Sequence, residues 1–149
     1  MELVRTGNSH PDFIGLVRLL DLELNERYGT AQAQYNAHNA MDPLSTAIVG
    51  YLDNEPIACG CFKELDSQCI EIKRMFVKKA YRGRGVAREV LGYLEEWAAQ
   101  TGYKTGRLET GRGQPEAIGL YQQAGYERIK NYGPYKDMEN SICFEKGIG

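Results

Sequence analysis

Tyr81-Arg82-Gly83-Arg84-Gly85-Val86-Ala87 (YRGRGVA) connects a β-rich run to the most regular helical pattern in the chain. Glycine lets the backbone approach a ligand closely, and the free N–H groups at a helix start favour an anion. Arg82 and Arg84 add charged donors that suit phosphate. The segment predicts a pyrophosphate cradle; the alternative is a polar turn whose glycines only cap and whose arginines are solvated.

The sequence on both sides of this segment predicts a mixed α/β fold. Apolar residues recur at helical spacing from Val86 to near Gly102, and Asp53-Asn54-Glu55 has the composition of a hairpin turn. The β-rich runs around that turn therefore form an antiparallel meander. Residues 30–45 have no clear periodicity and stay unassigned. We expect strands at Met1–Thr6, Thr46–Leu52, Pro56–Leu65, Cys69–Val77, Arg107–Thr110, Tyr126–Ile129 and Ser141–Glu145, and helices from Pro11 to Gly29, Val86 to Gly102 and Pro115 to Ala124.

Length and composition are those of one globular domain, which we expect to span residues 1–149. The 149 residues are 42% hydrophobic and 26% charged, with a net charge of −2. Such a chain lacks the positive field that drives binding to nucleic acid. No apolar run has the length of a signal peptide or a membrane span, so we expect a cytoplasmic protein without a membrane partner.

The cysteines and histidines do not predict a metal site. Cys59, Cys61, Cys69 and Cys143 lack the paired CxxC spacing of zinc ligands, and cysteine in apolar runs commonly behaves as a small buried hydrophobe. His10 and His38 are the only histidines, and we expect both at the surface.

The segment resembles the coenzyme-A signature of the GCN5-related N-acetyltransferase (GNAT) family, Q/R-x-x-G-x-G/A, read here as Arg82, Gly85 and Ala87. The segment from Gln114 to Tyr126 resembles the family's second landmark, a helix with Ala, Tyr and a closing Gly-aromatic pair. Gln114 stands where the family often has Asn. Two landmarks in the correct order are more specific than one, and neither GxxxxGK[ST] nor GxGxxG is present.

The resemblance implies the GNAT fold: a mixed, mostly antiparallel central sheet flanked by helices. Its two middle strands, ending at Met75-Phe76-Val77 and near Glu109, splay apart so that pantetheine inserts between them like an extra strand. A backbone amide there would also polarise the thioester carbonyl. The resemblance assigns acetyl-CoA binding, without metal, to Phe76, Val77, Arg82, Gly83, Arg84, Gly85, Val86, Ala87 and Gln114.

Direct acyl transfer to an amine needs a base and an acid. Tyr121 matches the tyrosine proposed as general acid in the family, although it also shares a face with apolar helix residues. Glu71 matches the base of histone-modifying members, and alternation leaves it pointing either into the acceptor cleft or into solvent beside Lys73. Glu109 is the reserve base. The aromatic group Tyr126, Tyr132 and Tyr135 either lines the acceptor pocket or packs under a loop.

These features predict an acetyl-CoA-dependent N-acetyltransferase that acts on a primary amine of a small molecule or peptide. The acidic balance favours cationic acceptors by electrostatic steering. One rival is an acyl-CoA-binding sensor without turnover, and another is a nucleotide-phosphate binder with different chemistry. The sequence leaves the acceptor and a homodimer open.

Overall fold

The computed structural model describes residues 1–29 and 43–149, so His38 and most of the unassigned segment lie outside the described residues. The described elements, in chain order, are β1 (Glu2–Thr6), α1 (Pro11–Tyr28), β2 (Ala47–Leu52), β3 (Glu55–Asp66), β4 (Cys69–Val77), the 3₁₀ turn η2 (Lys79–Tyr81), α3 (Val86–Thr101), β5 (Thr105–Gly111), α4 (Pro115–Gln123), β6 (Glu127–Ile129), the 3₁₀ turn η3 (Gly133–Tyr135) and β7 (Ser141–Gly147).

The predicted strands and helices are confirmed, with ends that differ by up to about two residues. The hairpin between β2 and β3 turns at Asp53 and Asn54, whose φ angles of 50° and 66° are those of a tight two-residue turn. His10 is not simply a surface residue, because its Nδ1 accepts a hydrogen bond from the Asp12 amide at 3.1 Å and so caps α1.

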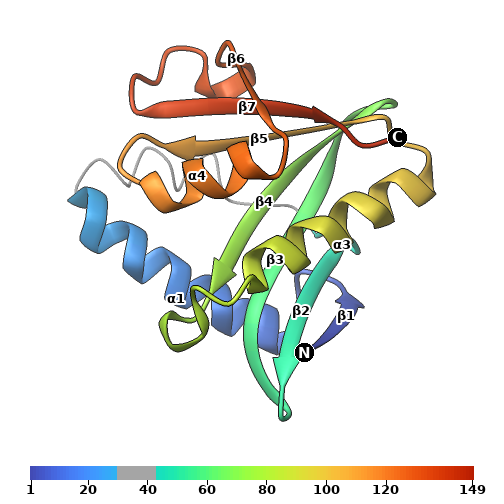
Figure 1. Cartoon of the computed structure of the whole chain (residues 1–149), viewed down its shortest axis with the longest axis vertical. Coiled ribbons are helices and arrows are strands. Elements are labelled where there is room, and N and C mark those ends of the chain that lie inside the picture. The colour runs from blue at the N-terminus through green and yellow to red at the C-terminus, as the bar shows by residue number, and fades with distance from the viewer. Residues whose placement is uncertain (30–42) are drawn as a thin grey trace.

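The described strands form one sheet in the order β1-β2-β3-β4-β5-β7-β6. Its neighbouring strands are antiparallel except for β4 and β5, which run parallel. The mixed, mostly antiparallel sheet expected from the resemblance is therefore present. The parallel pair lies in the middle of the sheet, with α3 as the crossover between its strands (Figure 1).

Helices cover both faces of the sheet. On one face, α3 and α4 pack over a large core that includes Val90, Leu91 and Leu94 at the spacing of one helix side. On the other face, α1 packs through Phe13 and Leu16 onto the inner strands (Figure 1). The four cysteines are buried free thiols, as predicted for Cys59 and Cys61.

The parallel pair separates halfway along its length. β4 and β5 pair from Cys69 opposite Thr105 to Ile72 opposite Leu108, and this pairing stops there while both strands continue. A bulge lies just beyond that point, because Arg74 has φ +59° and β4 changes register against β3 there. The splay implied by the resemblance is thus present, and it opens a gap between the two helix-covered faces.

Candidate active site

The helix α3 begins with uncapped amides. Gly85 is its N-cap residue and has no side chain to accept from the first turn, and both Gly83 and Gly85 have positive φ, at 78° and 79°. A Cβ atom added to either glycine would meet nothing within 4 Å. Within residues 1–29 and 43–149, no protein group caps the first-turn amides of α3. The turn therefore offers N–H groups and open space to an anion.

A cavity of about 430 Å³ lies against this helix start. It extends from the turn before α3 to the splayed end of β4 and to α4. Eight of the nine residues predicted to bind the cofactor line it, together with Tyr121. Its walls are Leu20, Glu23, Met75, Phe76, Val77, Tyr81, Arg82, Gly83, Gly85, Val86, Ala87, Arg88, Gln114, Glu116, Ala117, Leu120, Tyr121 and Gln123.

Arg84 is the one predicted cofactor residue that does not line this cavity. The Arg84 guanidinium lies 5.5 Å from the centre of the Tyr81 ring instead. The Arg82 side chain is at the cavity wall, but its guanidinium is bonded to protein: Nε donates to the Val77 carbonyl at 2.8 Å, and Nη2 pairs with Glu23 of α1 at 2.9 Å. Arg82 therefore braces the turn against β4 and α1, which differs from the expected role of a phosphate donor.

The splayed end of β4 forms one side of the cavity. Phe76 and Val77 pair with β3 on their other side, while the parallel pairing with β5 has ended at Ile72. An extended ligand can therefore add to this strand edge through backbone hydrogen bonds. The Val77 carbonyl already accepts a hydrogen bond from Arg82. Its second lone pair can accept a hydrogen bond from a ligand.

A second cavity, of about 110 Å³, opens where β4 and β5 diverge. It shares Leu20, Met75, Gln114, Ala117 and Tyr121 with the first cavity, so the two meet at the splay. Its further walls come from α1, β4, β5 and η3. They are Leu24, Tyr28, Ile72, Lys73, Arg74, Glu109, Thr110, Gly111 and Tyr135.

Tyr121 lies at the junction of the two cavities. It is buried on α4, and its ring packs edge-on against Tyr126 with 6.0 Å between ring centres. Among the described residues, no protein group forms a hydrogen bond with its hydroxyl. Burial, followed by the charge of Glu109, raises the pKa of Tyr121. The phenol therefore keeps its proton at neutral pH and has a cavity on each side.

Glu71 does not line either of these cavities. Its side chain is neither in solvent nor in the cleft: it is buried and lies 3.3 Å from the Lys73 ammonium, and the Tyr132 hydroxyl donates to it. Lys63 approaches it from the surface at 3.8 Å. Both of the orientations expected from strand alternation are thus replaced by a buried ion pair, because η3 and its flanks cover this part of the sheet.

Glu109, the reserve candidate, lines the second cavity. Burial raises its pKa from 4.5 to about 7, while the hydrogen bond that Ser141 donates at 2.7 Å and the charge of Lys73 oppose the rise. A carboxyl group that titrates near neutral pH suits proton transfer. The structure therefore places Glu109, rather than Glu71, beside Tyr121 at the splay.

The aromatic group divides between the two roles that the sequence left open. Tyr135 lines the second cavity and accepts a hydrogen bond from Lys73 at 3.1 Å. Tyr132 donates to Glu71, and Tyr126 donates to Glu95 of α3 at 2.7 Å, away from both cavities. Only tertiary contacts separate these three tyrosines.

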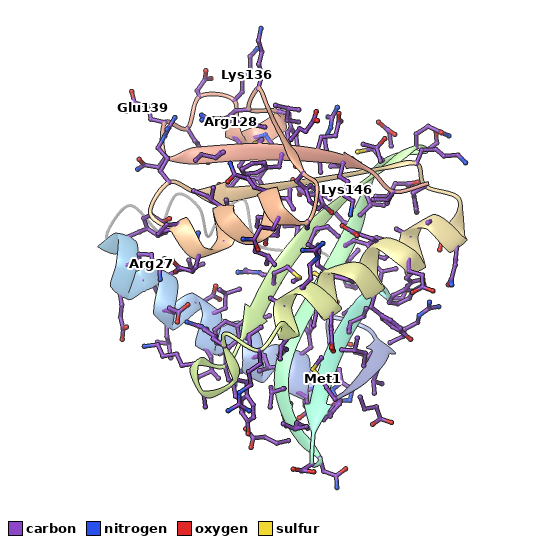
Figure 2. The ribbon with its side chains drawn as sticks, viewed as in Figure 1. Met1, Arg27, Arg128, Lys136, Glu139 and Lys146 are labelled. Atoms are coloured by element: carbon purple, nitrogen blue, oxygen red, sulfur yellow. The ribbon has the colours of Figure 1, made fainter. Side chains whose placement is uncertain are left out.

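The helix α1 closes both cavities from one side, a role that the sequence did not indicate. Leu20 lies in both walls, and Arg27 reaches the opposite side, where it pairs with Glu116 of α4 at 2.7 Å and donates to the Gly113 carbonyl at 2.8 Å. Figure 2 shows Arg27 at the end of α1 nearest α4. The periodicity of α1 predicts a buried face, but not what that face covers.

The splayed parallel pair and the uncapped start of α3 are the two features that the resemblance to the GNAT family implies. Residues 13–126 match the model of the acetyltransferase (GNAT) family. The chain belongs to this family.

Relatives and solved structures agree with that placement. The chain is 34% identical to the uncharacterized N-acetyltransferase YsnE of Bacillus subtilis over 97 residues. This aligned region is 64% of this chain and 64% of YsnE. It superposes with a TM-score of 0.84 on a candidate acyl-CoA N-acyltransferase of Klebsiella pneumoniae, at 27% identity and over 99% and 97% of the two chains. A GNAT family acetyltransferase from Elizabethkingia anophelis with acetyl-CoA bound has the same fold, with a TM-score of 0.60 at 22% identity over 68% and 74% of the chains. The match thus spans less than two thirds of the YsnE sequence.

Two further findings concern the described residues alone. No described helix is long and apolar enough to cross a membrane. No group of three or more His, Cys, Asp or Glu side chains in residues 1–29 and 43–149 is arranged to hold a metal ion.

Proposed function

We propose that this chain is an acetyl-CoA-dependent N-acetyltransferase that moves an acetyl group directly to a primary amine of a small molecule or peptide. The observation that carries the proposal is the meeting of two cavities at Tyr121, one against the uncapped start of α3 and the other beside Glu109. Membership of the GNAT family and the N-acetyltransferase names of its relatives support the reaction type.

The first cavity suits acetyl-CoA. The amides after Gly85 and the open space at Gly83 and Gly85 would hold the diphosphate, and the splayed edge at Phe76 and Val77 would hold the pantetheine amides. Arg82 would keep these two parts in register, because it bonds to the Val77 carbonyl from the turn. Acetyl-CoA supplies an acetyl group activated as a thioester.

Glu109 and Tyr121 would perform the two proton transfers. Glu109 takes the proton that the amine loses as its nitrogen bonds to the acetyl carbon, and its pKa of about 7 lets it do so at neutral pH. Tyr121 gives its proton to the sulfur as the carbon–sulfur bond breaks, and then regains one from solvent. Glu71 acts through Lys73, whose ammonium it holds in the wall of the second cavity.

The test is thiol release from acetyl-CoA over a panel of primary amines, together with calorimetry of acetyl-CoA binding. We expect binding and an amine-dependent release of free thiol, with acetylated amine formed in equal amount. Binding without amine-dependent release would instead support the sensor. A stronger thermal shift with ATP or NAD than with acetyl-CoA would support the nucleotide binder.

A further inference from the structure

The second cavity carries an unusual balance of charge for a site that accepts an amine. Of the described residues that line it, Lys73 and Arg74 are cationic and Glu109 is the one carboxyl group. Glu71 and Asp21, the carboxylates that form ion pairs with these two cations, do not line the cavity. An acceptor inside it therefore meets one group that takes a proton and two positive groups.

We propose that the acceptor is a small primary amine that also carries a carboxylate, as in an amino acid. This inference rests on the proposed function and names the substrate class of the same site. The amine faces Glu109, and the carboxylate faces Lys73, with Arg74 adding to the positive field. The net charge of the chain points toward cationic acceptors, but the lining of this cavity points the other way.

The strand register brings the two recognising groups together. Ile72 and Leu108 are the last paired residues of β4 and β5, so Lys73 and Glu109 are the first residues beyond the pairing on adjacent parallel strands. They therefore lie side by side where the gap begins. An ammonium and a carboxylate attached to one carbon atom, or to neighbouring carbons, match this pair with opposite charges.

The contacts of the two cations hold their side chains in place. The Lys73 ammonium lies 3.3 Å from Glu71 and 3.1 Å from the Tyr135 hydroxyl, and the Arg74 guanidinium lies 2.8 Å from Asp21. Such fixed groups recognise a carboxylate without first having to be ordered. A second ammonium on the acceptor, as in a polyamine, would meet like charge in a largely buried site.

The size of the cavity limits the acceptor. Its volume of about 110 Å³ is about a quarter of the 430 Å³ of the first cavity. Leu20 and Leu24 of α1 form its apolar side. The cavity therefore suits an acceptor with a short side chain.

The experiment compares matched acceptors on the wild-type protein. We would measure kcat/KM by thiol release at saturating acetyl-CoA for alanine, alaninamide and ethylamine. We expect alanine to exceed both others by on the order of 10- to 100-fold, the range for loss of a hydrogen bond to a charged group. The α-amine of the amide loses its proton at lower pH than that of the acid, so simple reactivity favours alaninamide, and a preference for alanine reports recognition.

Two variants test whether Lys73 causes the preference for alanine. The double variant Glu71→Gln/Lys73→Gln removes the cation and its partner together, and we expect the ratio of alanine to alaninamide to fall to about 1 in the folded fraction. Lys63→Gln is the matched control, because Lys63 also approaches Glu71, at 3.8 Å, but its side chain is 41% exposed and does not line the cavity. We expect its ratio to equal that of the wild type.

Each other result decides against the inference. Equal or faster reaction of alaninamide or ethylamine would overturn it while leaving the N-acetyltransferase function intact. An unchanged ratio in the double variant would remove Lys73 from the recognition of the acceptor. Binding of acetyl-CoA without thiol release for any amine of the wider panel would overturn the proposed function, and this inference with it.

Discussion

Replacing Glu109 with Gln is expected to stabilise the protein above pH 7 and, at the same time, to slow acetyl transfer. The change keeps the size of the side chain and an oxygen that can accept from Ser141, but removes the charge. Because burial is what raises the pKa of Glu109, the charged carboxylate costs the folded state free energy. Enzyme active sites commonly contain groups that lower the stability of the folded state.

The size and sign of the change in the free energy of unfolding follow from the pKa of Glu109. A rise from 4.5 to about 7 corresponds to about 3 kcal/mol, at about 1.4 kcal/mol for each pH unit. Between these two pH values the folded state binds more protons at Glu109 than the unfolded state does, so the free energy of unfolding falls as the pH rises. The wild type therefore loses about 3 kcal/mol by pH 8, and Glu109→Gln does not.

The assay has two parts. Urea denaturation at pH 5 and pH 8 should find the variant close to the wild type at the lower pH and more stable by up to about 3 kcal/mol at the higher pH. Thiol release should show kcat lower by on the order of 10²- to 10⁴-fold, with the pH dependence near 7 removed from the profile. A variant that is less stable than the wild type at pH 8, or that keeps the wild-type pH profile, would refute the reasoning.

Glu71→Gln is the matched control on the neighbouring strand. The same chemical change there removes the carboxylate that compensates the buried Lys73 ammonium, so we expect it to destabilise the protein by on the order of 3 kcal/mol. The two substitutions should thus change stability in opposite directions at pH 8. A rate loss in Glu71→Gln that grows at low pH, without a loss of stability, would instead make Glu71 the base.

Further substitutions test the other parts of the site. Tyr121→Phe should lower kcat by on the order of 10²-fold or more while the calorimetric affinity for acetyl-CoA stays nearly unchanged, and equal turnover would remove its role as acid. Gly85→Glu should abolish measurable acetyl-CoA binding, because it places a side chain at φ +79° and a negative charge at the helix start, and retained affinity would contradict the cradle. Arg82→Ala should weaken acetyl-CoA binding and lower the melting temperature more than Arg84→Ala, since Arg82 joins β4 to α1 whereas Arg84 lies outside the cavity; equal effects would contradict the bracing role.

The sequence by itself determined the fold, the order of its elements and the turn before α3. These depend on local chemistry: the period of apolar residues in Val86–Thr101, the hairpin turn at Asp53 and Asn54, and the glycines with positive φ at positions 83 and 85. The sequence also singled out Tyr121, which lines both cavities, because a family landmark surrounds it. Each of these signals lies within a few residues of the feature that it predicts.

Only the tertiary structure shows that Glu109 lines a cavity whereas Glu71 does not line either of the two, and only it reveals the partners of Arg82. Glu71 and Glu109 each follow an apolar residue on a central strand, yet one faces a buried ammonium and the other faces a cavity. Their difference arises from η3 and β7, which follow in the chain and supply Tyr135 and Ser141. The protonation of a carboxyl group depends on burial and on charges brought near it by distant segments, and local sequence does not contain that information.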